Sequence, residues 1–198
     1  MHLIFKHTKI NNKKEEKGLS LIESAMVLAL AATVTAGVMF YYQSASDSNK
    51  TQAAISEVMS ATSAINGLYI GQSSYNGLSE SVLKNSSAIP DNYKTDNGIM
   101  NPFGGNLTVA ADSNARGYGY SLKLDKLPKS ACISLATLNL GTSAAGYGIN
   151  HNASSNITIG DSVSSAMAKK TAISPAEAAH PDNGCNNASD NSVTYYMK

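Results

Sequence analysis

The feature that most constrains this chain is an apolar run near its N-terminus that contains one acidic residue. The run, LSLIESAMVLALAATVTAGVMFYY, spans residues 19–42, and no charged residue follows Glu23 before Asp47. About 20 apolar residues suffice to cross a bilayer as a helix. A charged side chain at the middle of such a span costs on the order of 2.5–3.5 kcal/mol, so Glu23 requires a functional explanation.

Lysine-rich residues 1–18 precede the apolar run. A short basic segment before an apolar helix is typical of a chain that enters a membrane with its N-terminus in the cytoplasm. Three interpretations follow: a secretory signal cleaved near Ala29-Leu30-Ala31, a permanent anchor, or a specially processed segment. The first conflicts with Glu23 and with hydrophobicity that continues to Tyr42, and the second leaves Glu23 unexplained.

Helical periodicity continues beyond the apolar run. Gly71 fits the end of a helix, and no proline occurs before Pro90. We therefore expect one long helix over 19–70, apolar over 19–42 and amphipathic over 43–70. Its second half carries a stripe of residues at helical spacing, namely Ile55, Val58, Met59, Thr62, Ile65 and Tyr69.

The remainder, residues 71–198, predicts an α+β head. Residues 71–106 contain Asn-Gly and Gly-Gly turn signals and are expected to form a loop with short helical pieces. A β-hairpin is expected over 107–124, with strands at 107–111 and 117–124. The other expected elements are a helix over 128–139, a strand over 146–150, a helix over 174–180 that opens with a capping box from Ser174 to Glu177, and a strand over 193–197.

Composition and motifs give no support for an enzyme or a nucleic-acid-binding protein. The net charge is only +1, which provides no electrostatic basis for binding nucleic acid. Neither His151 nor His180 has Cys or His neighbours at metal-ligand spacing, and no phosphate-binding glycine motif occurs. We expect no catalytic residue, no metal and no cofactor, and we place His151 at the surface.

Cys132 and Cys185 are the only two cysteines. A disulfide between them would close a loop of roughly 54 residues and stabilise the fold by about 4 kcal/mol in the chain-entropy model. Two buried free thiols are the alternative. The membrane-directed N-terminus indicates export, and export favours the disulfide.

The processing motif decides among the three interpretations of the N-terminus. Gly18, Leu19 and a glutamate four residues later, within KGLSLIE, resemble the processing signal of type IV prepilins. The chain is similar to the type IVb class, because the residue after Gly18 is leucine and no proline interrupts the helix. The likeness extends over most of the chain, through ISEVMSATSAINGLYIGQ, SAIPDNYK, NPFGG, ACISLATLNLGTSA and VTYYMK.

This resemblance implies a type IV pilin fold, in which a long N-terminal helical spine packs on an antiparallel β-sheet. The spine maps to 19–70, the αβ-loop to 71–106, and a disulfide-bounded D-region to Cys132–Cys185. It also implies that a prepilin peptidase removes residues 1–18, cutting between Gly18 and Leu19, and methylates the new amino group of Leu19.

The resemblance further implies that the chain is the major subunit of a surface filament used in adherence and aggregation. The subunit would lie in the inner membrane before assembly and in the extracellular pilus afterwards. Its partners would be identical subunits, the peptidase, the inner-membrane assembly machinery and host-cell surfaces. A minor pilin, a pseudopilin of a secretion system and a secreted binding protein are the alternatives.

Two sets of side chains are candidates for assembly. Glu23 can neutralise the Leu19 amine of a neighbouring subunit, and this pair would fix the axial stagger because a buried unpaired charge is costly. A stripe of small residues on one helix face would allow close helix packing, although alanine is also simply a good helix former. The stripe consists of Ala25, Ala29, Ala32 and Ala36.

Overall fold

The structure is a computed structural model, and it describes residues 20–198 apart from positions 88, 97, 115 and 152–156. The expected leader, 1–18, and Leu19 lie outside the described residues. The chain forms two compact units, the first ending at Gln43 and the second spanning Ser44–Lys198.

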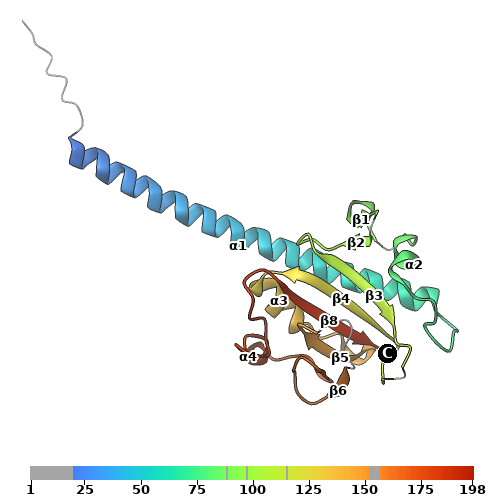
Figure 1. Cartoon of the computed structure of the whole chain (residues 1–198). Helices are drawn as coiled ribbons and strands as arrows, with labels where there is room; N and C mark the ends of the chain where they lie inside the picture. Colours follow the sequence, from blue (N-terminus) through green and yellow to red (C-terminus); the bar gives the residue numbers. More distant parts are fainter. Residues whose placement is uncertain (1–19, 88, 97, 115, 152–156) are drawn as a thin grey trace, which may run out of the picture. The chain divides into compact units, whose positions relative to one another are not determined.

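The long helix α1 spans Leu21–Leu68, where the sequence predicted a helix over 19–70 (Figure 1). It continues through Gly37, since one interior glycine costs only about 1 kcal/mol relative to alanine. Its end is followed by Gly71, which adopts a φ of 80°. Residues other than glycine rarely adopt this left-handed conformation, so Gly71 suits a chain that must turn away from the helix axis.

The buried face of the second half of α1 overlaps the predicted stripe, and Ile55 and Tyr69 pack half-buried against the core. Val58 and Ile65 are buried as expected, but Met59 is 59% exposed. Small residues at Ala54 and Ala61 lie on the buried face instead. The residues that α1 buries in the core therefore include small side chains as well as large apolar ones.

An eight-stranded sheet forms the second unit, in the order β1-β2-β3-β4-β8-β5-β7-β6. Its neighbours pair antiparallel except β6 and β7, which pair parallel, unlike the purely antiparallel sheet expected. The strand β8 lies between β4 and β5 (Figure 1). The strands are β1 Lys94–Thr95, β2 Gly98–Met100, β3 Asn106–Ala111, β4 Tyr120–Leu127, β5 Ala144–Ile149, β6 Thr158–Gly160, β7 Met167–Lys169 and β8 Asn191–Met197.

The strands β3 and β4 occupy the region where a hairpin was predicted, but β4 begins later than expected. Its first residue is Tyr120 rather than Gly117, because Gly117 has a φ of 94° and belongs to the connecting turn. The remaining helices are α2 Glu80–Lys84, η1 Asp91–Tyr93, α3 Lys129–Ala136, η2 Gly141–Ser143 and α4 Pro175–Ala178.

The two faces of the central strands differ in what covers them. Leu122 and Tyr195 are paired neighbours on the inner face and pack with the second half of α1 and with α3 in one core. The Tyr195 hydroxyl donates a hydrogen bond to the Leu135 carbonyl of α3 at 2.8 Å. Because side chains alternate along a strand, Lys123 and Thr194 lie on the opposite, outer face.

Glu57 is an anomaly in this core. Its side chain lies on the buried face of α1, and the residue is only 4% exposed. In the described part of the chain neither of its carboxylate oxygens has a hydrogen-bond partner. Burial raises the pKa of Glu57 to about 7, because removing a carboxylate from water disfavours its charged form.

Replacing Glu57 with glutamine should therefore stabilise the protein in a pH-dependent way. Because folding raises the pKa of Glu57, the ionised side chain destabilises the folded state. This destabilisation is absent below pH 4.5, the ordinary pKa, grows between pH 4.5 and about pH 7, and is constant at higher pH. We expect Glu57→Gln to increase the free energy of unfolding by about 3 kcal/mol at pH 8 and by almost nothing at pH 4. Denaturant unfolding of the detergent-solubilised chain measures both values.

The exposed Asp190 provides the matched control. Asp190→Asn makes the same change of charge at the surface and should leave the free energy of unfolding nearly unchanged at both pH values. A Glu57→Gln variant that is no more stable than the parent at pH 8 would contradict the account of a destabilising buried carboxylate.

Candidate functional site

The start of α1 is closed by a reciprocal pair of hydrogen bonds. The Ser20 backbone N–H donates to Glu23 Oε2 at 2.8 Å, and the Glu23 backbone N–H donates to Ser20 Oγ at 3.2 Å. This is a capping box, which satisfies two N–H groups that a helix otherwise leaves unpaired. The S-x-x-E pattern at 20–23 signals this local role of Glu23, which was not among the predictions. Glu23 itself remains exposed.

The hydroxyl groups in the apolar half of α1 are also satisfied within the helix. The side chains of Ser24, Thr33 and Thr35 each donate to a backbone carbonyl three or four residues earlier, at 2.8–2.9 Å. Serine and threonine commonly bond this way inside helices. These hydroxyls therefore need no water, and the segment suits an apolar environment.

The surface of this half is apolar all round. By length and composition the helix could cross a membrane, and Tyr41 and Tyr42 stand at the end of the apolar run, where aromatic residues favour a membrane–water interface. Its large apolar side chains are all exposed, namely Leu21, Ile22, Met26, Val27, Leu28, Leu30, Val34, Val38, Met39, Phe40, Tyr41 and Tyr42. Such a surface requires lipid or other apolar helices to cover it.

The four alanines of the predicted packing stripe lie within this helix and are exposed. Ala25, Ala29, Ala32 and Ala36 follow one another at spacings of four, three and four residues. Regular α-helical geometry places these spacings on one face. The cleavage residues Gly18 and Leu19 cannot be placed beside them, because they lie outside the described residues.

The second unit contains the disulfide between Cys132 and Cys185, which the structure confirms. It joins α3 to the segment after α4 across a sequence separation of 53, with the two Cα atoms 5.9 Å apart. Both cysteines are fully buried in the core. The bond therefore links α3 covalently to the segment between α4 and β8.

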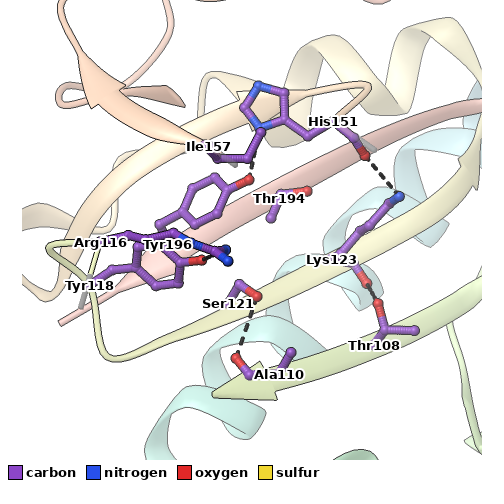
Figure 2. Close-up of a pocket in the computed structure, with 10 residues that line it drawn as sticks. All are labelled: Thr108, Ala110, Arg116, Tyr118, Ser121, Lys123, His151, Ile157, Thr194 and Tyr196. Carbon is purple, nitrogen blue, oxygen red and sulfur yellow. Dashed lines mark hydrogen bonds between the residues drawn. The ribbon is translucent and has the colours of Figure 1, made fainter. Parts of the chain in front are cut away.

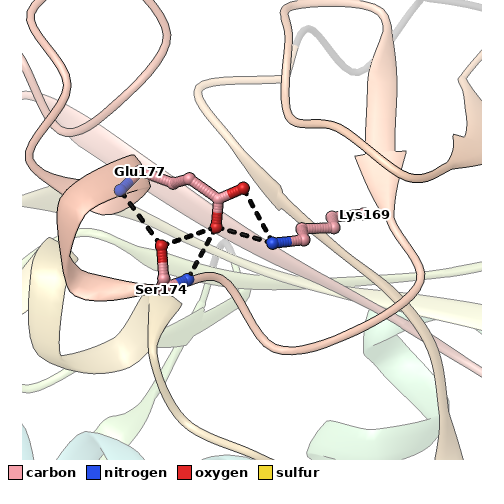
Figure 3. Close-up of polar contacts among 3 residues, drawn as sticks. All are labelled: Lys169, Ser174 and Glu177. Carbon is pink, nitrogen blue, oxygen red and sulfur yellow. Dashed lines mark hydrogen bonds and ion pairs between the residues drawn. The ribbon is translucent and has the colours of Figure 1, made fainter.

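A polar cluster reinforces this disulfide-bounded region (Figure 3). Lys169, at the end of β7, bonds both carboxylate oxygens of Glu177 in α4, at 2.7 and 2.6 Å. Ser174 completes the capping box predicted there. The hydrogen bond from Lys169, followed by those from Ser174, lowers the pKa of Glu177 to about 2. Ionised Glu177 thus holds β7 against α4.

His151 is buried, so its predicted surface position is wrong. Its Nδ1 lies 2.8 Å from the Tyr196 hydroxyl and its Nε2 lies 2.8 Å from the Ser164 carbonyl oxygen. Because a carbonyl only accepts, Nε2 carries the proton. Burial lowers the pKa of His151, which keeps the ring neutral at pH 7. Among the described residues no three His, Cys, Asp or Glu side chains gather as metal ligands.

Similarity to known proteins extends over nearly the whole chain. A protein family described as Bundlin matches residues 43–195. Two curated relatives, from Escherichia coli O111:H- and from Escherichia coli O127:H6 (strain E2348/69 / EPEC), are each 66% identical over 194 residues. The alignments cover 96% of this chain and 99% of each relative. Both relatives are named "Major structural subunit of bundle-forming pilus".

Removing the disulfide should weaken the second unit. We expect Cys132→Ala combined with Cys185→Ala to lower the free energy of unfolding by about 4 kcal/mol, because the unfolded chain regains the entropy of a long loop. Denaturant unfolding and the steady-state amount of subunit in cells are the measurements. The parent chain treated with reductant should show the same loss, and equal stability of all three samples would contradict a stabilising role for the bond.

Proposed function

Because this chain belongs to the bundlin family, we propose that it is the major structural subunit of a bundle-forming pilus, a polymer of identical copies on the bacterial surface. The structural observation that carries the proposal is the apolar first half of α1. Its large side chains are exposed and its hydroxyls are bonded internally. A helix of this kind can exchange lipid for the helices of other subunits without exposing new polar groups.

The proposed life cycle begins in the inner membrane. A prepilin peptidase removes residues 1–18 between Gly18 and Leu19 and methylates the Leu19 amine, and the inner-membrane assembly machinery then withdraws α1 into the filament. The lysine-rich segment before the apolar run supports a cytoplasmic N-terminus at the outset. The subunit is then extracellular, which agrees with its disulfide.

Glu23 is proposed to set the register between subunits. Its carboxylate stands at the first turn of α1 and is exposed. A cationic amine on Leu19 of a neighbouring copy would lose its water when helices pack, and Glu23 can offset that cost at only one axial stagger. The capping box does not oppose this role, because the bond from Ser20 uses only one of the two carboxylate oxygens.

The alanine stripe supports close packing in the same filament core. Ala25, Ala29, Ala32 and Ala36 leave a shallow face along α1, and shallow faces let helix backbones approach in apolar surroundings. The second unit would then face outward and carry adherence, autoaggregation and microcolony formation, with host-cell surfaces among its partners.

A minor pilin or a pseudopilin of a secretion system shares such an N-terminus, and a secreted binding protein shares the basic and apolar start. The names of both relatives favour the major subunit over these alternatives. Purified surface filaments composed mainly of this chain distinguish a major subunit from a minor one.

The mature N-terminus provides the direct test. We expect mass spectrometry of subunits from sheared filaments to find a chain that begins at Leu19 with one additional methyl group. A chain that begins near Ala32 would indicate conventional signal cleavage and would remove Glu23 from the mature protein. That result would refute the proposed assembly helix.

Three substitutions separate the capping role of Glu23 from its charge. Glu23→Gln keeps a side chain that can complete the capping box but removes the charge, whereas Ser20→Ala weakens the capping box and keeps the charge. Glu23→Ala removes both. If charge sets the register, Glu23→Gln and Glu23→Ala should both yield at least tenfold fewer filaments. Ser20→Ala should assemble nearly normally.

Filament yield is measured by shearing, and the amount of cleaved subunit in the membrane is measured in the same cells. The amount of cleaved subunit should be equal in the parent and the three variants. Normal piliation by Glu23→Gln would show that Glu23 acts only as a helix cap.

A further inference from the structure

A small cavity opens on the outer face of the sheet, opposite the face that packs on α1. Its volume is about 110 Å³. Residues of β3, β4 and β8 form its floor, and its walls include Arg116, Tyr118, His151 and Ile157 (Figure 2). The rings of Tyr118 and Tyr196 meet edge to face on one side, with centroids 4.8 Å apart.

The lining carries positive charge. Arg116 and Lys123 both border the cavity, and none of the described residues that line it is acidic. Lys123 Nζ donates to the His151 carbonyl oxygen at 3.0 Å and has no carboxylate within ion-pair distance in the described part of the chain. Two further donor hydrogens of its ammonium group are therefore available.

Arg116 has a weak acidic partner. Its Nε lies 3.9 Å from Asp112 Oδ1, but the Asp112 carboxylate already accepts hydrogen bonds from the backbone N–H groups of Asn114 and Arg116. Arg116 Nη1 donates to the Tyr118 hydroxyl at 3.2 Å. The guanidinium thus borders the cavity with donors to spare and with its charge only partly offset.

An unsatisfied hydroxyl lines the same cavity. Thr194 is only 4% exposed, and its Oγ1 has no hydrogen-bond partner among the described residues. A buried hydroxyl without a partner costs free energy, so such groups are rare unless a missing ligand or water satisfies them. Figure 2 shows Thr194 between Tyr196 and Lys123. The neutral His151 ring, whose Nδ1 lies 2.8 Å from the Tyr196 hydroxyl, adds no negative charge.

We propose that this cavity binds a small oxyanion, such as a phosphate, sulfate or carboxylate group. Lys123 and Arg116 supply the charge, and Thr194 supplies a hydroxyl donor. The volume corresponds to roughly four water molecules, which suits one such group and excludes a larger molecule except as a projecting end. Charge-assisted hydrogen bonds of this kind are about twice as strong as neutral ones.

The site lies on β-strands of the second unit, and it is independent of the proposed assembly chemistry of α1. A group that enters it can be a free ion or the end of a larger anionic molecule. Both sources present the same chemistry to Lys123, Arg116 and Thr194.

The test is a titration of the full-length, detergent-solubilised chain with sodium phosphate at pH 7 and constant ionic strength. Residue-specific NMR signals of β4 and β8 are the readout. We expect a saturable shift of the Lys123 and Thr194 amide signals. Lys123→Met, which keeps the apolar stem, should weaken binding roughly tenfold or more.

Lys170→Met is the matched control. Lys170 follows β7, its side chain is 58% exposed, and it is not among the residues that line the cavity. This variant loses the same charge and should bind phosphate like the parent. Equal weakening by Lys123→Met and Lys170→Met would show that only net charge matters, and the proposed site would be wrong.

Thr194→Val tests the hydroxyl without removing a packed side chain. Valine has nearly the same shape, so the variant should unfold at the same or a higher denaturant concentration than the parent. Phosphate binding should nevertheless weaken by roughly threefold to tenfold. Unchanged binding in both Thr194→Val and Lys123→Met would overturn the proposal.

A second titration with glycerol 1-phosphate distinguishes the two sources. Binding of the ester with similar affinity indicates an open mouth that accepts the end of a larger molecule. Binding of inorganic phosphate alone indicates a site for a free ion. Failure of both ligands to shift the signals of β4 and β8 would refute the oxyanion site.

Discussion

The need of a helix to satisfy its own polar groups governs the first unit of this molecule. In a membrane or a filament core, no water is present to pair with N–H groups or hydroxyls. The capping box of Ser20 and Glu23 and the internal bonds of Thr33 and Thr35 meet this condition. The same helix therefore suits both lipid and protein surroundings, as the proposed assembly requires.

The extent of α1 was predictable because it depends on local properties. An uninterrupted apolar run, helical spacing and the absence of proline are visible in the sequence, and the helix spans Leu21–Leu68. Its buried face was only partly predictable, since Met59 is exposed whereas Ala54 and Ala61 are buried. Which helix residues become buried depends on the side chains of both packing partners, and the sequence of the helix alone describes one of them.

In the second unit, even less of the structure could be predicted from the sequence. The capping box at Ser174 was predicted from four adjacent residues, but the central place of β8 and the burial of His151 depend on strands far apart in sequence. The cavity of the outer face combines residues from Thr108 to Tyr196. None of these residues carries a recognisable motif, so only the assembled sheet reveals that two cations and an unsatisfied hydroxyl share one cavity.

The position of β8 has a consequence for how the subunit matures. Without β8, the sheet order leaves two separate pieces, β1 to β4 and β5 to β7, each with an unpaired edge. Because β8 follows the other described strands in the chain, the edges of β4 and β5 stay unpaired during export until Asn191–Met197 has emerged. Open edges invite aggregation and proteolysis. A chain that ends before β8 would therefore expose the edges of β4 and β5 to pairing with other chains.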